Sequence, residues 1–339
     1  MTDQADNAAA LRSRLRAVGL SSQAIRAAWP AWWAPEAEAS VSARVELRFE
    51  LARRLGLDPR SLIDPAAEPS FLWRGGRFKR LAAESQREQW AISSFGTTVG
   101  RLLLQASADG EPSLLARGPG LLRGAILDAG SPFVSLEDLL ALAWAAGVAV
   151  AHLRVFPLDQ KRMAAMSVRP DRRSAILLAK DAKYPAPIEF YLAHELGHIA
   201  LGHIAAGGLV VDLEEAVPRL ELTDREERAA DGYAIELLTG TPGLTVEPFE
   251  KPGLGSEIAR TVLAAAGRER IEPGILAQLY GFATGEWASV GVALRNIYRG
   301  PRDVAASVNE IARGQLRFDA LPDDGALFLK AVLGSAPGA

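Results

Sequence analysis

The sequence contains no cysteine, and this absence excludes several classes of protein at once. A chain without cysteine has no disulfide scaffold, no iron–sulfur cluster, no thiol nucleophile and no cysteine-ligated zinc finger. It also lacks an excess of charge of either sign, because 38 Lys and Arg residues face 41 Asp and Glu residues and the formal charge is −3. That balance argues against a protein that binds nucleic acid through a strongly basic surface.

Long apolar runs are missing too. The longest, from Leu139 to Ala151, spans 13 residues, whereas a membrane-spanning helix needs about 20. The N-terminus carries Asp3 and Asp6 and has no apolar core of the kind found in signal peptides. We therefore expect a cytoplasmic protein that does not bind a membrane. Its hydrophobic content of 49% over 339 residues is sufficient for packed cores in two or three domains.

Histidine is scarce, but it is concentrated in one place. Only four histidines occur, and three of them, His194, His198 and His203, fall within ten consecutive residues. His194, Glu195 and His198 form an H-E-x-x-H motif. Residues four apart lie on one face of a helix, so both imidazoles can bind one metal ion while Glu195 holds the water molecule beside it. The alternative interpretation is a pair of ordinary core histidines.

A catalytic zinc ion needs a third protein ligand and an open position for water. The third histidine is a poor candidate, because a helix that continued to residue 203 would place His203 about 180° away from His194. That geometry favours a structural or surface role for His203. If Gly202 ends the helix instead, His203 is free to approach the site as an outer partner of a ligand or as an oxyanion donor.

A better third ligand lies on a second predicted helix, over about 223–238, capped by Thr223 or Asp224. Glu227 and Asp231 lie four residues apart on one face of this helix, so we assign Glu227 to the metal. We assign Asp231 to the outer N–H of one of the histidines, a contact that orients the ring. The nearest competitor is Glu226, and a solvated acidic helix start is the alternative for these carboxylates. Four residues are candidates for a second oxyanion donor: Tyr184, Tyr191, His203 and Tyr233.

The pattern of apolar residues predicts an α+β fold that is mainly helical. Around the motif we expect a helix over 135–146, strands over 148–155, 163–168 and 174–179, and the histidine-bearing helix from about residue 188. Upstream, a helix is predicted from about residue 77 to 106 with an interruption near Gly96. Four regions are expected: a helical domain over 1–66, a mixed connecting region over 70–125, a core over 126–240 and a helical region over 245–339.

The N-terminal region resembles part of a DNA-binding domain. Residues 51–63 resemble the last helices of phage-repressor-type helix-turn-helix domains. Where a recognition helix should lie, the stretch 29–35 contains Pro30 and Pro35 and no basic cluster, and a helix cannot run through these prolines. DNA binding through residues 1–64 is therefore a weaker expectation than a helical packing or protein-interaction module.

The segment from about Gly147 to Leu238 resembles the ImmA/IrrE family of zinc metallopeptidases. The family pattern of short strands, an H-E-L-G-H helix and a following helix with an E-x-x-A-D/N signature is matched in order and spacing. The chain departs from the family at Tyr191, where Thr is usual, and at Thr239-Gly240, where Met-Pro is usual. The matching residues are His194-Glu195-Leu196-Gly197-His198, Glu227-x-x-Ala230-Asp231 and Ala234-x-x-Leu237-Leu238.

The resemblance implies a zincin-like minimal metallopeptidase core that binds one Zn²⁺ per chain through His194, His198 and Glu227. Zinc there would lower the pKa of a bound water toward ~7 and polarise the scissile carbonyl, while Glu195 moves the water proton to the leaving amine. The implied substrate is a protein or peptide, with a helix-turn-helix repressor as one candidate, in stress, mobile-element or toxin–antitoxin regulation. Two alternatives stay open: a DNA-binding regulator with a structural or sensory zinc site, and a non-catalytic binding module such as an antitoxin.

Overall fold

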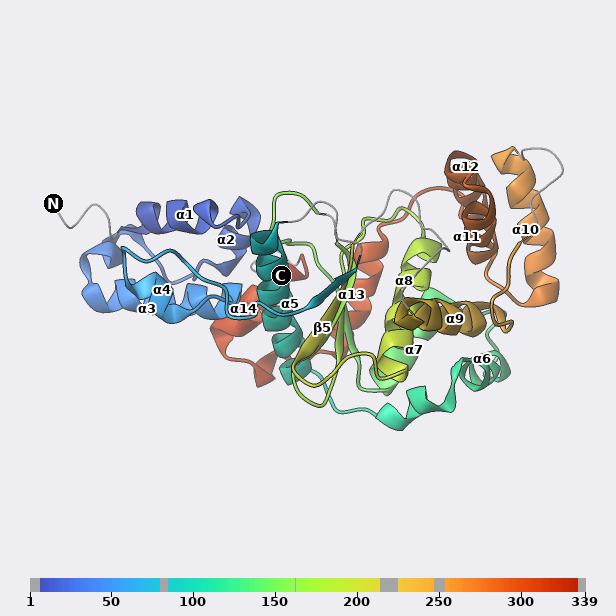
Figure 1. Ribbon diagram of the computed structural model, residues 1–339, viewed down its shortest axis with the longest axis horizontal. Helices are drawn as coiled ribbons and strands as arrows, with labels where there is room; N and C mark the ends of the chain where they lie inside the picture. Colours follow the sequence, from blue (N-terminus) through green and yellow to red (C-terminus); the bar gives the residue numbers. More distant parts are fainter. Residues whose placement is uncertain (1–6, 80–84, 162, 214–224, 247–253, 335–339) are drawn as a thin grey trace.

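The computed structural model describes residues 7–79, 85–161, 163–213, 225–246 and 254–334. The molecule is elongated, with the N-terminal helices at one end, a five-stranded sheet in the middle and helices of the C-terminal region at the other end (Figure 1). The predicted α+β fold, mainly helical with a small sheet, is confirmed. No helix in the described ranges is long and apolar enough to cross a membrane.

The N-terminal helices are short, and each starts at a residue whose side chain accepts a backbone N–H, as N-caps do. They are α1 (Ala8–Ala17), α2 (Ser22–Ala28), α3 (Val41–Leu55) and α4 (Pro59–Ile63). Between α2 and α3 the chain forms only the 3₁₀ helix η1 (Pro35–Ala39), whose first turn carries Glu36 and Glu38. As Pro30 and Pro35 predicted, no α-helix runs through residues 29–35.

One helix prediction needs correction. Residues 77–79 form a strand, β1 (Arg77–Lys79), and the long helix α5 (Gln86–Ala106) begins only after a capping box formed by Ser85 and Glu88. The helix is not interrupted near Gly96. A glycine there lets α5 approach the sheet, because a Cβ at this position would collide with the side chain of Met166. The apolar pattern correctly predicted a helix over most of this range, but Gly96 is a site of close packing on the sheet and does not interrupt the helix.

The sheet has the order β1-β5-β3-β4-β2 and mixes both strand directions. Its core strand β3 (Met163–Arg169) pairs antiparallel with β4 (Ala175–Leu178) and β5 (Gly208–Leu213). Strand β2 (Ala149–His152) runs parallel to β4, and β1 runs parallel to β5. The three predicted strands are present, whereas β1 and β5 were not predicted.

Each face of the sheet packs against its own apolar core. One core joins the N-terminal helices, α5 and the last helix of the chain to one face. The other core joins the helices of residues 136–145, 185–200 and 225–239, and the four helices between residues 255 and 315, to the opposite face. The helix predicted over 135–146 is α7 (Leu136–Ala145), started by a capping box. The remaining helices are α6 (Pro119–Asp128), α8 (Pro185–Ala200), α9 (Arg225–Thr239), α10 (Gly255–Glu269), α11 (Pro273–Thr284), α12 (Trp287–Ile297), α13 (Val304–Gln315) and α14 (Asp323–Val332).

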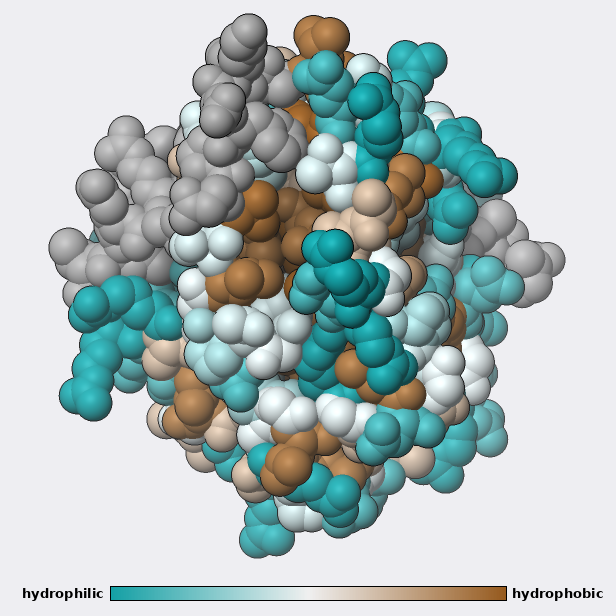
Figure 2. Space-filling model, turned by 90° about the vertical axis from the view of Figure 1, so that its right-hand side faces the viewer, coloured by the Kyte–Doolittle hydropathy of each residue, from teal (hydrophilic) through white to brown (hydrophobic). Residues whose placement is uncertain are grey.

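The end of the molecule formed by the C-terminal helices is partly apolar at its surface. Figure 2 shows this face, on which hydrophobic residues gather around a hollow and hydrophilic residues occupy much of the rim. Leu263 of α10 and Val292 of α12 are among the exposed apolar side chains of these helices.

Candidate metal centre

Helix α8 carries both histidines of the motif. It starts with Pro185 at a first-turn position, where the missing N–H costs nothing. His194 and His198 lie one turn apart, are buried, and direct their Nε2 atoms to within 3.0 Å of each other. The spacing of four residues therefore brings two ligand nitrogens together, as the sequence predicted.

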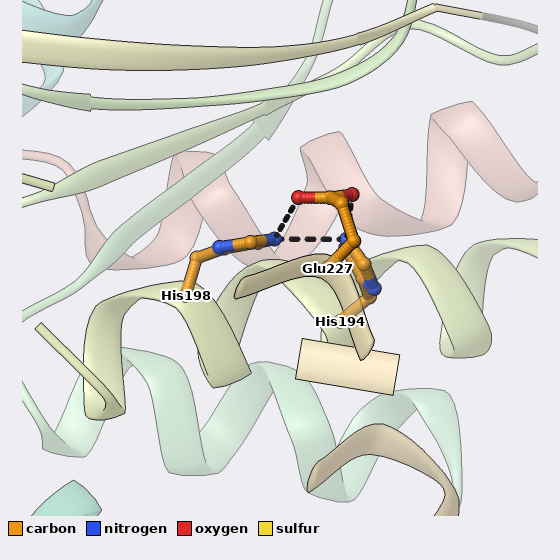
Figure 3. A group of neighbouring side chains, drawn as sticks. All are labelled: His194, His198 and Glu227. Carbon is orange, nitrogen blue, oxygen red and sulfur yellow. Dashed lines mark hydrogen bonds and ion pairs between the residues drawn. The ribbon is translucent and has the colours of Figure 1, made fainter. Parts of the chain in front are cut away.

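Helix α9 brings the third group. It packs closely on α8 at Gly197, where a Cβ would lie 3.1 Å from the carbonyl oxygen of Ala230 and 3.2 Å from Cβ of Tyr233. This close approach places the buried Glu227 over the two imidazoles (Figure 3). Oε1 of Glu227 lies 3.3 Å from Nε2 of His198, and Oε2 lies 3.7 Å from Nε2 of His194. The predicted helix caps, Thr223 and Asp224, lie outside the described residues.

The three donors fit a metal ion. His194, His198 and Glu227 each offer one ligand atom, and these atoms lie within 4.8 Å of one another in a buried position. In a tetrahedral site with ligand atoms about 2.0–2.1 Å from the metal, neighbouring ligand atoms would be about 3.3 Å apart. The distances of 3.0, 3.3 and 3.7 Å bracket that value. The group could therefore hold a metal ion with little rearrangement of the side chains.

Asp231 lies where the sequence assigned it. Its Oδ1 is 2.7 Å from Nδ1 of His194, on the side of the ring opposite Nε2. A carboxylate that accepts the Nδ1 proton fixes the tautomer in which Nε2 is free to bind a metal. Glu227 and Asp231, one helical turn apart, thus contact His194 from its two sides.

His203 contacts a candidate metal ligand, whereas the sequence favoured a structural or surface role for it. Helix α8 ends at Ala200, and Gly202 adopts a left-handed conformation with φ of +72°. The chain therefore turns back, and Nδ1 of His203 lies 2.8 Å from Nδ1 of His198. His203 stands to His198 as Asp231 stands to His194: each contacts the outer nitrogen of a candidate ligand.

Asp212 belongs to the site and was missed by the sequence analysis. It lies on β5, is 8% exposed, and places Oδ2 3.2 Å from Nε2 of His194. The run of Leu209, Val210 and Val211 after two glycines is typical of a strand, and alternation along it would have placed Asp212 on the face opposite Val211. Nothing in the local sequence, however, indicates that this face meets the histidine helix.

The acidic surroundings change the ionisation of His194. Burial lowers the pKa of this imidazole, but Asp212 and Asp231 outweigh burial and raise the pKa to about 10. Two carboxylates thus favour a positive charge at His194 when no metal is bound. A metal ion must compete with a proton there, and the same carboxylates favour the cation that replaces it.

The other predicted site residues are two glutamates, Glu195 and Glu226, and three tyrosines. Glu195 is completely buried directly after His194, whereas Glu226 is partly exposed and pairs with Arg77, so Glu227 and not Glu226 joins the histidines. The tyrosines have other neighbours. Tyr184 stacks on Tyr298, Tyr191 lies against Lys180, and the buried Tyr233, whose pKa burial raises to about 12, packs against Gly197. The identity of an oxyanion donor stays a prediction.

Comparison with known proteins identifies no relative: no family model matches the chain, and neither a curated protein nor a solved structure matches it.

Proposed function

We propose that this protein is a zinc-dependent metallopeptidase with a zincin-like core. The observation that carries the proposal is the buried group of His194, His198 and Glu227, together with the buried Glu195 that follows His194 on α8. Two histidines and one glutamate are the protein ligands of one type of catalytic zinc site, which leaves a fourth position for water. The resemblance of residues 147–238 to the ImmA/IrrE family supports the same proposal.

The donor set supports zinc over harder cations. Two imidazole nitrogens suit zinc and other transition metals, whereas magnesium and calcium prefer a shell made of oxygen atoms. The separations of the three donor atoms also bracket the value expected for a tetrahedral ion. One Zn²⁺ per chain is therefore the proposed cofactor.

Zinc at this position would supply a Lewis acid that activates water and polarises the scissile carbonyl. Glu195 takes the proton of the attacking water and transfers it to the nitrogen of the leaving amine. Asp231 and His203 hold the outer nitrogens of His194 and His198 and thereby keep both rings in place. The proposed substrate is a protein or peptide in the cytoplasm, with a helix-turn-helix repressor as one candidate.

The test combines metal content and cleavage. Wild type should bind one zinc ion per chain, and Glu227→Ala should lose it, whereas the neighbouring Glu226→Ala should retain it. Glu195→Gln should retain zinc and lose cleavage of a repressor encoded nearby. Full zinc content in Glu227→Ala would remove Glu227 from the ligand set, and cleavage by Glu195→Gln would remove Glu195 as the base.

A non-catalytic zinc site is the second candidate, because one specific observation favours it. Asp212 lies 3.2 Å from Nε2 of His194, which is close to the separation of about 3.3 Å between neighbouring ligand atoms of a tetrahedral site. A site closed by four protein ligands is typical of structural zinc. The electronic spectrum of the Co²⁺-substituted protein distinguishes the two, because an open site responds to added small anions and a closed site does not.

A further inference from the structure

Strand β1 lies directly beside the candidate metal centre. It lies alongside β5 (Figure 1) and pairs with it in parallel. The register places Arg77 beside Val210 and Lys79 beside Asp212, the residue that contacts His194. Because β3 occupies one edge of β5, β1 occupies the only other edge. An extended polypeptide that adds to β5 next to the metal must therefore take the place of β1.

Arg77 connects β1 to helix α9 and to the segment that follows helix α8. Its guanidinium forms an ion pair with Glu226, which precedes Glu227 on α9. The same guanidinium donates a hydrogen bond to the carbonyl oxygen of His203, whose ring contacts His198. One arginine thus spans the gap between the start of α9 and the segment that follows α8.

The charges of β1 and its surroundings are complementary. The strand has the sequence Arg-Phe-Lys, with cationic residues on either side of one aromatic residue. Two neighbouring elements place carboxylates beside it: Asp212 on β5 pairs in register with Lys79, and Glu226 on α9 forms the ion pair with Arg77. The edge of β5 beside the candidate metal centre is therefore occupied, in the protein itself, by an extended segment with basic side chains.

The strand is short, and its ion pair with α9 lies at the surface. It comprises three residues, and the ion pair that anchors it is solvent-accessible, with 53% of the Arg77 side chain and 41% of the Glu226 side chain exposed. Exposed ion pairs of this kind stabilise a structure little. Gly75 lies in open space before the strand and gives the backbone conformational freedom there, whereas Gly76 packs closely against Leu209 of β5. Phe78 packs only partly into the core.

We propose that β1 occupies the position of an extended substrate segment and competes with it, and that the substrate segment is itself basic. This proposal rests on the metallopeptidase function proposed above and adds the chemistry of its substrate. The charge pattern of β1 defines the class: an extended peptide in which Arg or Lys alternates with an apolar residue. Such a peptide binds when β1 leaves the edge of β5.

Two measurements that need no catalysis test the proposal. The first is the rate at which a chromogenic chelator, 4-(2-pyridylazo)resorcinol, removes zinc from the holoprotein. Arg77→Ala frees β1 and should accelerate removal about fivefold, the factor expected for one weak ion pair. The matched control is Arg87→Ala, which removes another exposed ion pair, with Glu68, and should react at the wild-type rate.

The second measurement is the affinity of a fluorescent peptide with the sequence of residues 74–79, Arg-Gly-Gly-Arg-Phe-Lys, for zinc-loaded Glu195→Gln protein. The double variant Glu195→Gln/Arg77→Ala should bind this peptide about fivefold more tightly than Glu195→Gln alone. A control peptide with Glu in place of the three cationic residues should not bind. Glu226→Gln removes the same ion pair from α9 and replaces Arg77→Ala if that variant does not fold.

Equal chelation rates and equal peptide affinities with and without Arg77 would overturn the proposal. Tight binding of the acidic peptide would overturn the assignment of a basic substrate. These results are separable from the proposed function, because a protein that binds the basic peptide in competition with β1 but cleaves nothing would refute peptidase activity alone.

Discussion

Asp212 Oδ2 lies 3.2 Å from Nε2 of His194, the ring nitrogen that also faces His198 and Glu227. A nitrogen that binds a metal has no proton to donate, so in the metal-loaded protein Asp212 contributes negative charge beside the cation instead of accepting a hydrogen bond.

Replacement of Asp212 by Asn should therefore weaken metal binding. The side chain keeps its shape but loses its charge, and we expect zinc affinity to fall about 10–100-fold, the range typical of carboxylates around metal ligands. Competition with a chromogenic chelator measures the change. Asp181→Asn, at an exposed position, serves as the control and should bind zinc as wild type does. Unchanged affinity in Asp212→Asn would show that this carboxylate does not act on the metal.

Asp231→Ala should weaken zinc binding by a different route. The substitution removes the acceptor that lies 2.7 Å from Nδ1 of His194, so the ring loses the contact that fixes its tautomer and orientation. We expect a loss of about 10–100-fold in zinc affinity, and Asp231→Glu should recover part of it. Isothermal titration with zinc tests both variants, and equal affinities of Asp231→Ala and wild type would contradict the assignment.

The contact of α8 with α9 makes a prediction at Gly197. A methyl group there would press on Ala230 and Tyr233, and this overpacking should lower the free energy of unfolding by about 1–3 kcal/mol. The displacement of α9 should also move Glu227 away from the histidines. Gly232→Ala on α9 is the matched control, because a Cβ at Gly232 meets no atom within 4 Å. That control should be neutral or stabilise α9 by up to about 1 kcal/mol. Urea unfolding and zinc affinity report the two effects, and a Gly197→Ala protein like wild type in both would contradict the packing argument.

Two buried carboxyl groups predict a pH dependence of stability. Glu189 lies on α8, where burial, with the charge of Glu272 adding to it, raises its pKa well above the usual range. Burial also raises the pKa of Glu272 to about 7, although Tyr298 donates a hydrogen bond to it. The folded protein therefore binds more protons than the unfolded chain between about pH 4.5 and pH 7, so the free energy of unfolding falls as the pH rises through that range.

Glu189→Gln should reduce this pH dependence. Over the pH range in which one carboxyl is protonated only in the folded state, the free energy of unfolding falls by about 1.4 kcal/mol per pH unit. The stability of Glu189→Gln relative to wild type should therefore be highest at pH 8 and lowest at pH 5. Urea unfolding of the metal-free proteins at both pH values is the measurement. Parallel pH profiles of Glu189→Gln and wild type would show that Glu189 does not cause the slope.

The sequence predicted the parts of the site whose geometry is set by residues within one or two turns of the same helix. The spacing of four residues in His194 and His198, and again in Glu227 and Asp231, follows from helix periodicity, which holds whatever the rest of the chain does. Capping residues such as Ser135 also act within one turn. For these features sequence and structure agree.

The parts that could not be predicted depend on contacts distant in sequence. Asp212 meets His194 only because β5 pairs with β3 beside α8, and no local pattern specifies that pairing. Strand β1 exists because β5 provides an edge for it. The position of His203 depends on a left-handed Gly202, a conformation that glycine permits but does not require.

The two separate apolar cores on the faces of the sheet have an evolutionary consequence. The three metal-binding candidates lie on helices of one side, whereas the N-terminal helices pack into the core of the other. The sheet therefore separates the N-terminal helices from the helix pair that carries the candidate metal-binding group. We expect that a lineage can exchange its N-terminal module for another and retain this group, provided that the new module preserves the strand that borders β5.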